Sequence, residues 1–86
     1  MDINETLDQR QKTHGIFIDH AHISQNLKHE LKQNESWIKL KPDQKEALEM
    51  IMHKVARILN GNPDIHDHWH DIAGYATLVA NCLKGN

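Results

Sequence analysis

The sequence predicts an all-α protein: one domain over residues 1–86, folded as a compact bundle of three long helices plus a short N-terminal helix. Three observations predict this fold class. No segment alternates apolar and polar residues with the period of two that is typical of strands. Apolar residues instead recur every three or four positions, as on one face of a helix. Aromatic residues are few, and a core of aliphatic side chains in so short a chain is often completed by oligomerisation.

A short segment and a longer one open the chain. Residues 4–13 are polar with Leu7 as the only apolar anchor, and we expect a short helix that ends at Gly15. Residues 16–34 form an amphipathic helix of about four turns. Its apolar side combines seven residues: Ile16, Phe17, His20, Ile23, Ser24, Leu27 and Leu31. We interpret His20 as a core residue, or as one that faces polar groups of the later helices.

In the second half of the chain, the sequence predicts a connection and two further helices. Residues 34–41 are a connection that we expect to fold over the end of the bundle through Trp37 and Ile38. Pro42 favours the first turn of a helix that stops at Gly61. Its predicted core stripe is Leu48, Ile51, Met52, Val55, Ile58 and Leu59. The last helix begins at 64–66 and runs to Lys84, before Gly85, with Ile65, Trp69, Ile72, Ala76, Val79 and Leu83 as its stripe.

Composition and charge exclude several classes of protein. The formal net charge is −2, which disfavours a nucleic-acid partner. No segment approaches the roughly 20 apolar residues of a membrane span, and the polar N-terminus is unlike a signal peptide. The single cysteine, Cys82, allows no disulfide within the chain. We therefore expect a cytoplasmic protein without a membrane anchor.

The helix over residues 42–60 carries two groups of candidate site residues. Glu46 and Glu49 lie one turn apart, a spacing at which two carboxylates can hold a divalent cation. With His53 and Arg57 they lie opposite the predicted stripe, where they can equally be surface ion pairs. Lys54 and Arg57 form a basic pair suited to phosphate oxygens.

The stretch "HDHWHDIAGY" at residues 66–75 resembles a metal site at first sight. His66 and His70 have the spacing of two zinc ligands, but no third ligand is placed near them, so zinc is disfavoured. His68 and Asp71 lie one turn apart at the edge of the core.

Small and apolar residues follow on the same helix. Gly74 in mid-helix suggests that a ligand, another helix or a second subunit passes close to the backbone. Tyr75, Leu78 and Cys82 form a second apolar strip, which favours packing between copies of the chain. We therefore expect a homo-oligomer, a dimer or a tetramer.

Three segments carry a family resemblance: "TLDQRQKTHGIF", "HKVARILNGNP" and "DHWHDIAGYATLVA". Over about residues 6–84 the chain resembles uncharacterised small phage and prophage domains, which look like distant members of the MazG-like all-α nucleoside-triphosphate pyrophosphohydrolases. The resemblance implies a helical bundle that dimerises or tetramerises. In catalytic members it implies Mg²⁺-dependent hydrolysis between the α- and β-phosphates, with metal ions held by ExxE and ExxD motifs.

Transferred to this sequence, the resemblance implies an incomplete magnesium site. The second motif falls on His68 and Asp71, where only the aspartate matches. The first falls on Glu46 and Glu49, or in another alignment on Lys54 and Arg57, where bases replace acids. The implied metal ligands are thus Glu46, Glu49, His68 and Asp71.

Three functions remain open at this point. We favour a degenerate domain that binds a nucleotide or phosphate through Lys54 and Arg57, with Trp69 or Tyr75 available to stack on a base. The first alternative is an active Mg²⁺-dependent nucleotide pyrophosphohydrolase. The second is a phage accessory or inhibitor protein that acts by contact with a host protein.

Overall fold

The computed structural model describes residues 2–84, and within this range every regular element is a helix. The elements are α1 (Ile3–His14), α2 (Phe17–Lys32), the 3-10 helix η1 (Glu35–Lys39), α3 (Pro42–Asn60) and α4 (His66–Cys82). The all-helical prediction and its three long helices are confirmed. The start of α3 at Pro42 and its end before Gly61 are also as predicted. Gly85, expected to follow the last helix, lies outside the described residues.

Local chemistry explains where several helices begin and end. The Asp2 carboxylate caps α1 by accepting a hydrogen bond of 2.9 Å from the Glu5 amide. Gly15 ends α1 with φ of 80°, a conformation that favours glycine. At the start of α3, the Lys41 amide donates to the Gln44 side chain at 2.9 Å.

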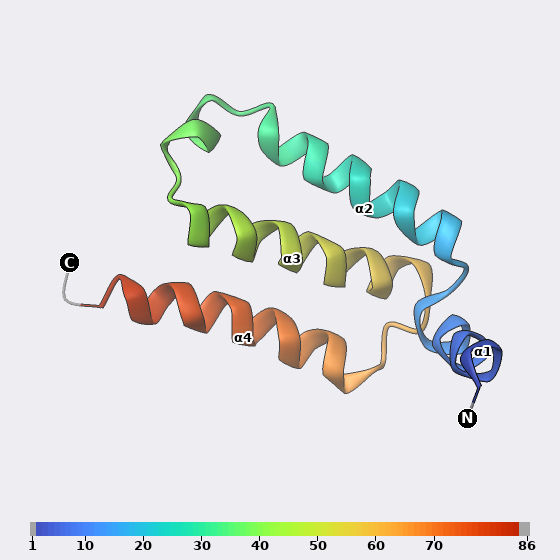
Figure 1. The fold of residues 1–86 in the computed structure, drawn as a ribbon. Helices are drawn as coiled ribbons and strands as arrows, with labels where there is room; N and C mark the ends of the chain where they lie inside the picture. The colour runs from blue at the N-terminus through green and yellow to red at the C-terminus, as the bar shows by residue number, and fades with distance from the viewer. Residues whose placement is uncertain (1, 85–86) are drawn as a thin grey trace.

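The three long helices lie side by side with α3 in the middle (Figure 1). Each runs opposite to the one before it, and α2 and α4 hardly contact one another. α1 lies across one end of this layer, where it contacts α2 and α3. No helix in residues 2–84 combines the length and apolar character needed to cross a membrane.

The central position of α3 corrects the prediction of a one-sided apolar stripe. Every residue from 47 to 58 is buried or partly buried, because α3 has neighbours on two sides. Its most buried residues are Ala47 and Ala56, which lie on opposite sides of the helix. Glu49, His53 and Arg57, expected to face solvent, are therefore partly buried. Leu59, a predicted stripe residue, is 63% exposed.

The predicted apolar stripe of α4 is wrong: the line of residues that the structure buries is rotated partway around the helix from it. The positions of α4 that are not exposed are His68, Asp71, Ile72, Tyr75 and Val79, which lie on the side of the helix that faces α3. Trp69, Ala76 and Leu83 are exposed instead.

The connection between α2 and α3 also differs from the expectation. Ile38, expected to anchor η1 over the bundle, is 81% exposed. Trp37 is partly buried, and the Lys45 ammonium lies 6.0 Å from the centre of its ring.

Candidate functional site

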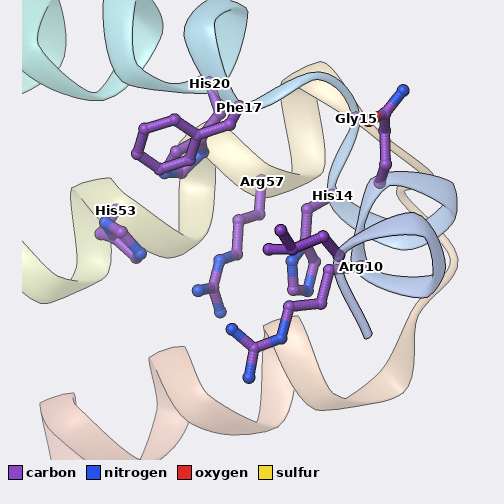
Figure 2. A pocket seen from close by; sticks show the side chains of 9 residues that line it. Arg10, His14, Gly15, Phe17, His20, His53 and Arg57 are labelled. Atoms are coloured by element: carbon purple, nitrogen blue, oxygen red, sulfur yellow. The ribbon is translucent and has the colours of Figure 1, made fainter. Parts of the chain in front are cut away.

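A cavity of about 360 Å³ lies at the end of the layer where α1 meets α2 and α3. Its lining combines basic, imidazole and apolar side chains, and it includes no carboxylate. The lining residues are Leu7, Arg10, Gln11, His14, Gly15, Phe17, His20, His53 and Arg57. Figure 2 shows the cavity with seven of these residues labelled.

The ends of α1 and α3 are tied together beside this cavity. The Asn60 side-chain amide donates to the carbonyls of His14, at 3.1 Å, and Ile16, at 2.9 Å. The Asn62 amide donates to the Thr13 carbonyl at 3.1 Å. Side chains would not fit here, because a Cβ on Gly15 would meet the Asn60 carbonyl, and one on Gly61 would meet the Thr13 carbonyl. These contacts hold α1 across the layer and so create the cavity.

The only two arginines of the sequence line this cavity, although 47 positions separate them. Arg10 comes from α1 and Arg57 from α3, and their side chains extend in the same direction (Figure 2). Neither guanidinium forms a salt bridge with a residue of the described range. Burial lowers the pKa of Arg57, and the positive charge of Arg10 lowers it further. The cavity therefore carries positive charge that no protein carboxylate neutralises by direct contact.

Histidine rings surround the arginines. His20 of α2 meets His53 of α3 edge-to-face, with 4.7 Å between the ring centroids. His14 of α1 lies 5.1 Å from His68 of α4 by the same measure. Burial, followed by the charge of Arg57, lowers the pKa of both His14 and His53 to about 4. Both rings are thus neutral at pH 7, where they can donate or accept hydrogen bonds without adding charge.

Two of these histidines contain buried ring nitrogens without a hydrogen-bond partner. His20 is 5% exposed and its Nδ1 has no partner among the described residues, although the ring lines the cavity. His68 is 3% exposed, and its Nε2 also has no hydrogen-bond partner among the described residues. A buried polar atom without a partner costs free energy, so both imidazoles lie in an unfavourable setting.

The structure separates the basic pair predicted on α3. Arg57 reaches the cavity, whereas the Lys54 ammonium donates to the Asp71 carboxylate of α4 at 2.9 Å. The Lys54 side chain is only 12% exposed. This hydrogen bond lowers the pKa of Asp71. Lys54 therefore joins α3 to α4 and is not a free phosphate-binding group.

The two aromatic residues predicted to stack on a base lie elsewhere. Trp69 is 56% exposed, and its indole N–H donates to the Pro63 carbonyl at 2.8 Å. Tyr75 lines a second, open depression along α4, together with His70, Asp71, Ala73, Gly74, Thr77 and Leu78. The aromatic residue at the cavity is Phe17, which is 75% exposed.

The proposed metal ligands are not brought together in the single chain. Glu49 forms an ion pair with Lys32 of α2 at 3.3 Å, and Asp71 is held by Lys54. Glu46 is exposed and His68 is buried. Across residues 2–84, no three His, Cys, Asp or Glu side chains are grouped as metal ligands would be. The donor set therefore does not fit a magnesium cage within one chain.

Reasoning from the sequence found Arg57 but missed Arg10, His14 and Phe17 as members of this site. Arg10 lies in a polar helix with no pattern of its own. The one usable signal was composition: the chain has eight lysines but only two arginines, and both arginines line this cavity.

Comparison with known proteins gives a family but no relative of known function. No curated protein and no solved structure matches the chain. A family model, DUF6378, described as a domain of unknown function, matches residues 3–83. Because this match covers nearly the whole sequence, the chain belongs to the DUF6378 family.

Proposed function

We propose that this chain is a binding module: a MazG-like bundle that binds a nucleotide or another phosphate compound rather than hydrolysing it. The observation that carries the proposal is the pair of guanidinium groups, Arg10 and Arg57, in one cavity without a carboxylate partner. Arginine presents a planar fork of donors that matches phosphate oxygens, and a partly buried setting strengthens such contacts.

The rest of the cavity suits the same ligand. Neutral imidazoles add hydrogen-bonding groups, while Leu7 and Phe17 add apolar surface. An anion bound between the arginines would offset the burial and mutual repulsion that lower the pKa of Arg57.

The arrangement of acids supports binding over hydrolysis. Magnesium-dependent hydrolysis needs carboxylates that converge on the phosphates. Here Glu49 and Asp71 are each engaged by a lysine, on opposite sides of α3. The proposal therefore treats the chain as a degenerate relative of the hydrolases.

Isothermal titration calorimetry of the purified protein with nucleotides, inorganic pyrophosphate and phosphate tests this proposal. We expect saturable binding that Arg57→Gln and Arg10→Gln each weaken roughly tenfold or more, since each removes a charge-assisted contact. Lys12→Gln is the matched control, because it removes a charge from α1 outside the cavity lining.

Three results would overturn the proposal. The first is the absence of binding by every phosphate compound, and the second is binding that the arginine variants leave unchanged. The third is release of pyrophosphate from a nucleoside triphosphate in Mg²⁺, abolished by Asp71→Asn, which would establish the hydrolase instead.

We also propose that the module acts as a homo-oligomer. Its radius of gyration is 14.8 Å, against about 12 Å for a globular chain of this length. Large apolar side chains remain exposed on α3, on α4 and directly after α4: Leu59, Trp69, Leu78 and Leu83. Light scattering on a sizing column should give at least twice the mass of one chain, and a monomer at all concentrations would contradict this proposal.

A further inference from the structure

The cavity offers positive charge where a metal-bound nucleotide would require negative charge. Mg²⁺ in nucleotide sites is held by carboxylates together with the phosphates. The lining contains two arginines and no acid, and Asp71, whose charge acts on Arg57, is already paired with Lys54. Two guanidinium groups would repel the divalent cation and take its place on the phosphate oxygens. The expected ligand is therefore a phosphate without a bound metal ion.

Two further features point to a ligand that is larger than phosphate. His20 lines the cavity on the α2 side, where its ring can contact a group of the ligand beyond the phosphate. Phe17 is a largely exposed aromatic ring at the same cavity, where a base can stack on it. Figure 2 shows His20 and Phe17 together on the α2 side, with the arginine side chains extending away from them.

The size of the cavity limits how much ligand it holds. Its volume of about 360 Å³ lies near the lower end of the range for small-molecule sites, which is roughly 300–1,000 Å³. A single nucleoside with one phosphate suits this space better than a dinucleotide or a triphosphate with its metal ion.

We propose that the cavity binds a nucleoside monophosphate free of Mg²⁺. The phosphate lies between Arg10 and Arg57, the base stacks on Phe17, and the base or sugar contacts the His20 ring. This inference rests on the proposed function and specifies its ligand class.

Calorimetry with AMP, GMP, CMP and UMP tests the ligand class, with inorganic phosphate and ribose 5-phosphate as fragments. We expect at least one monophosphate to bind more tightly than both fragments, with the same affinity in EDTA and in excess Mg²⁺. A nucleoside triphosphate should bind more weakly once Mg²⁺ is added, because the metal competes with the arginines. A requirement for Mg²⁺, or monophosphates that bind no better than inorganic phosphate, would overturn the inference.

Substitutions in the wall separate recognition of the base from recognition of the phosphate. Phe17→Leu should weaken monophosphate binding roughly tenfold and leave the affinity for inorganic phosphate unchanged. His20→Gln should act in the same direction, and circular dichroism verifies that each variant is folded. His22→Gln, an exposed position on the same helix, is the control for histidine removal. Because Phe17 is exposed, its variant tests the inference even where the His20 variant fails to fold.

The outcomes distinguish this inference from the proposed function. Phosphate binding that depends on Arg57 but is indifferent to Phe17 and to the base leaves the binding module standing and refutes the ligand class. Absence of binding by all phosphate compounds refutes both.

Discussion

At one end of the helical layer α1 crosses α2 and α3 and borders an open cavity, whereas at the other end η1 only links α2 to α3. The cavity end contains a glycine with positive φ and the histidine pair His20 and His53. At the η1 end, Asn34 bonds within an exposed turn, and Trp37 lies partly buried near Lys45.

We interpret this difference as stability that the cavity end gives up for the proposed function. Burial of imidazole nitrogens without partners and partial burial of the Arg57 guanidinium cost free energy. Departures from ordinary packing tend to occur at functional sites, which agrees with the binding that we propose for the cavity. The η1 end shows the ordinary case, with small exposed interactions that a substitution should hardly disturb.

The largest expected effect on stability comes from replacing Gly15, the glycine that ends α1. Gly15→Ala should lower the free energy of unfolding by about 3 kcal/mol, because φ is 80° and a Cβ would meet the Asn60 carbonyl. Urea denaturation measures the change. Gly74→Ala is the matched control: nothing lies within 4 Å of its added methyl group, and alanine should stabilise the helix by roughly 0.5–1 kcal/mol.

Equal effects of the two substitutions would contradict this account of the cavity end. A loss of stability in Gly74→Ala alone would have a different meaning. It would indicate that a second copy or a ligand packs against α4 at Gly74, as the sequence suggests.

The next effect concerns pH and the histidines of the cavity. Both His14 and His53 have a pKa of about 4 in the folded chain, against an ordinary value of 6.5. Between these values the unfolded chain binds protons that the folded chain does not, so stability falls as the pH falls. Stability should be constant above pH 6.5 and lose about 1–2 kcal/mol per histidine by pH 4, after allowance for solvent screening.

The charged groups around these two rings explain why their pKa values are lowered, and replacing the rings provides the control. Arg57, Lys54 and His20 act on both rings, while His68 also faces His14 and Lys28 also faces His53. Each of these groups acts against protonation of the ring that it faces. Replacing His14 and His53 by Gln should flatten the pH profile of the unfolding free energy, and an unchanged profile would show that other groups carry it.

Most of the fold could be predicted from the sequence because its helix boundaries depend on local chemistry. Pro42, Gly15 and Gly61 mark ends that the structure confirms. The faces of the helices were less predictable, since a helix in the middle of a layer buries two sides. In α4, apolar residues occur on all sides of the helix, so hydropathy placed Trp69 on the buried face. The structure buries the neighbouring His68 instead.

The site was only partly predictable, because its residues come from three helices. Arg57 stands out on α3, but its partner Arg10 lies in a helix whose placement depends on tertiary contacts. Lys54 and Asp71 were both identified as candidates, yet only the structure pairs them with each other and removes them from the ligand set.

The smallest effect compares one asparagine from each end of the layer. Asn60→Ala should lower the free energy of unfolding by about 1–2 kcal/mol, because it leaves the partly buried carbonyl of His14 and the carbonyl of Ile16 without their donor. Asn34→Ala removes one exposed contact of 3.2 Å to Glu30 and should change stability by less than about 0.5 kcal/mol. Thermal or urea denaturation of both variants gives the difference. If Asn34→Ala lowers the free energy of unfolding as much as Asn60→Ala does, the two ends contribute equally to stability. The unfavourable setting assigned to the cavity end is then not specific to that end. If Asn60→Ala also weakens phosphate binding while Asn34→Ala does not, the bond from α3 to the turn after α1 positions Arg10 opposite Arg57.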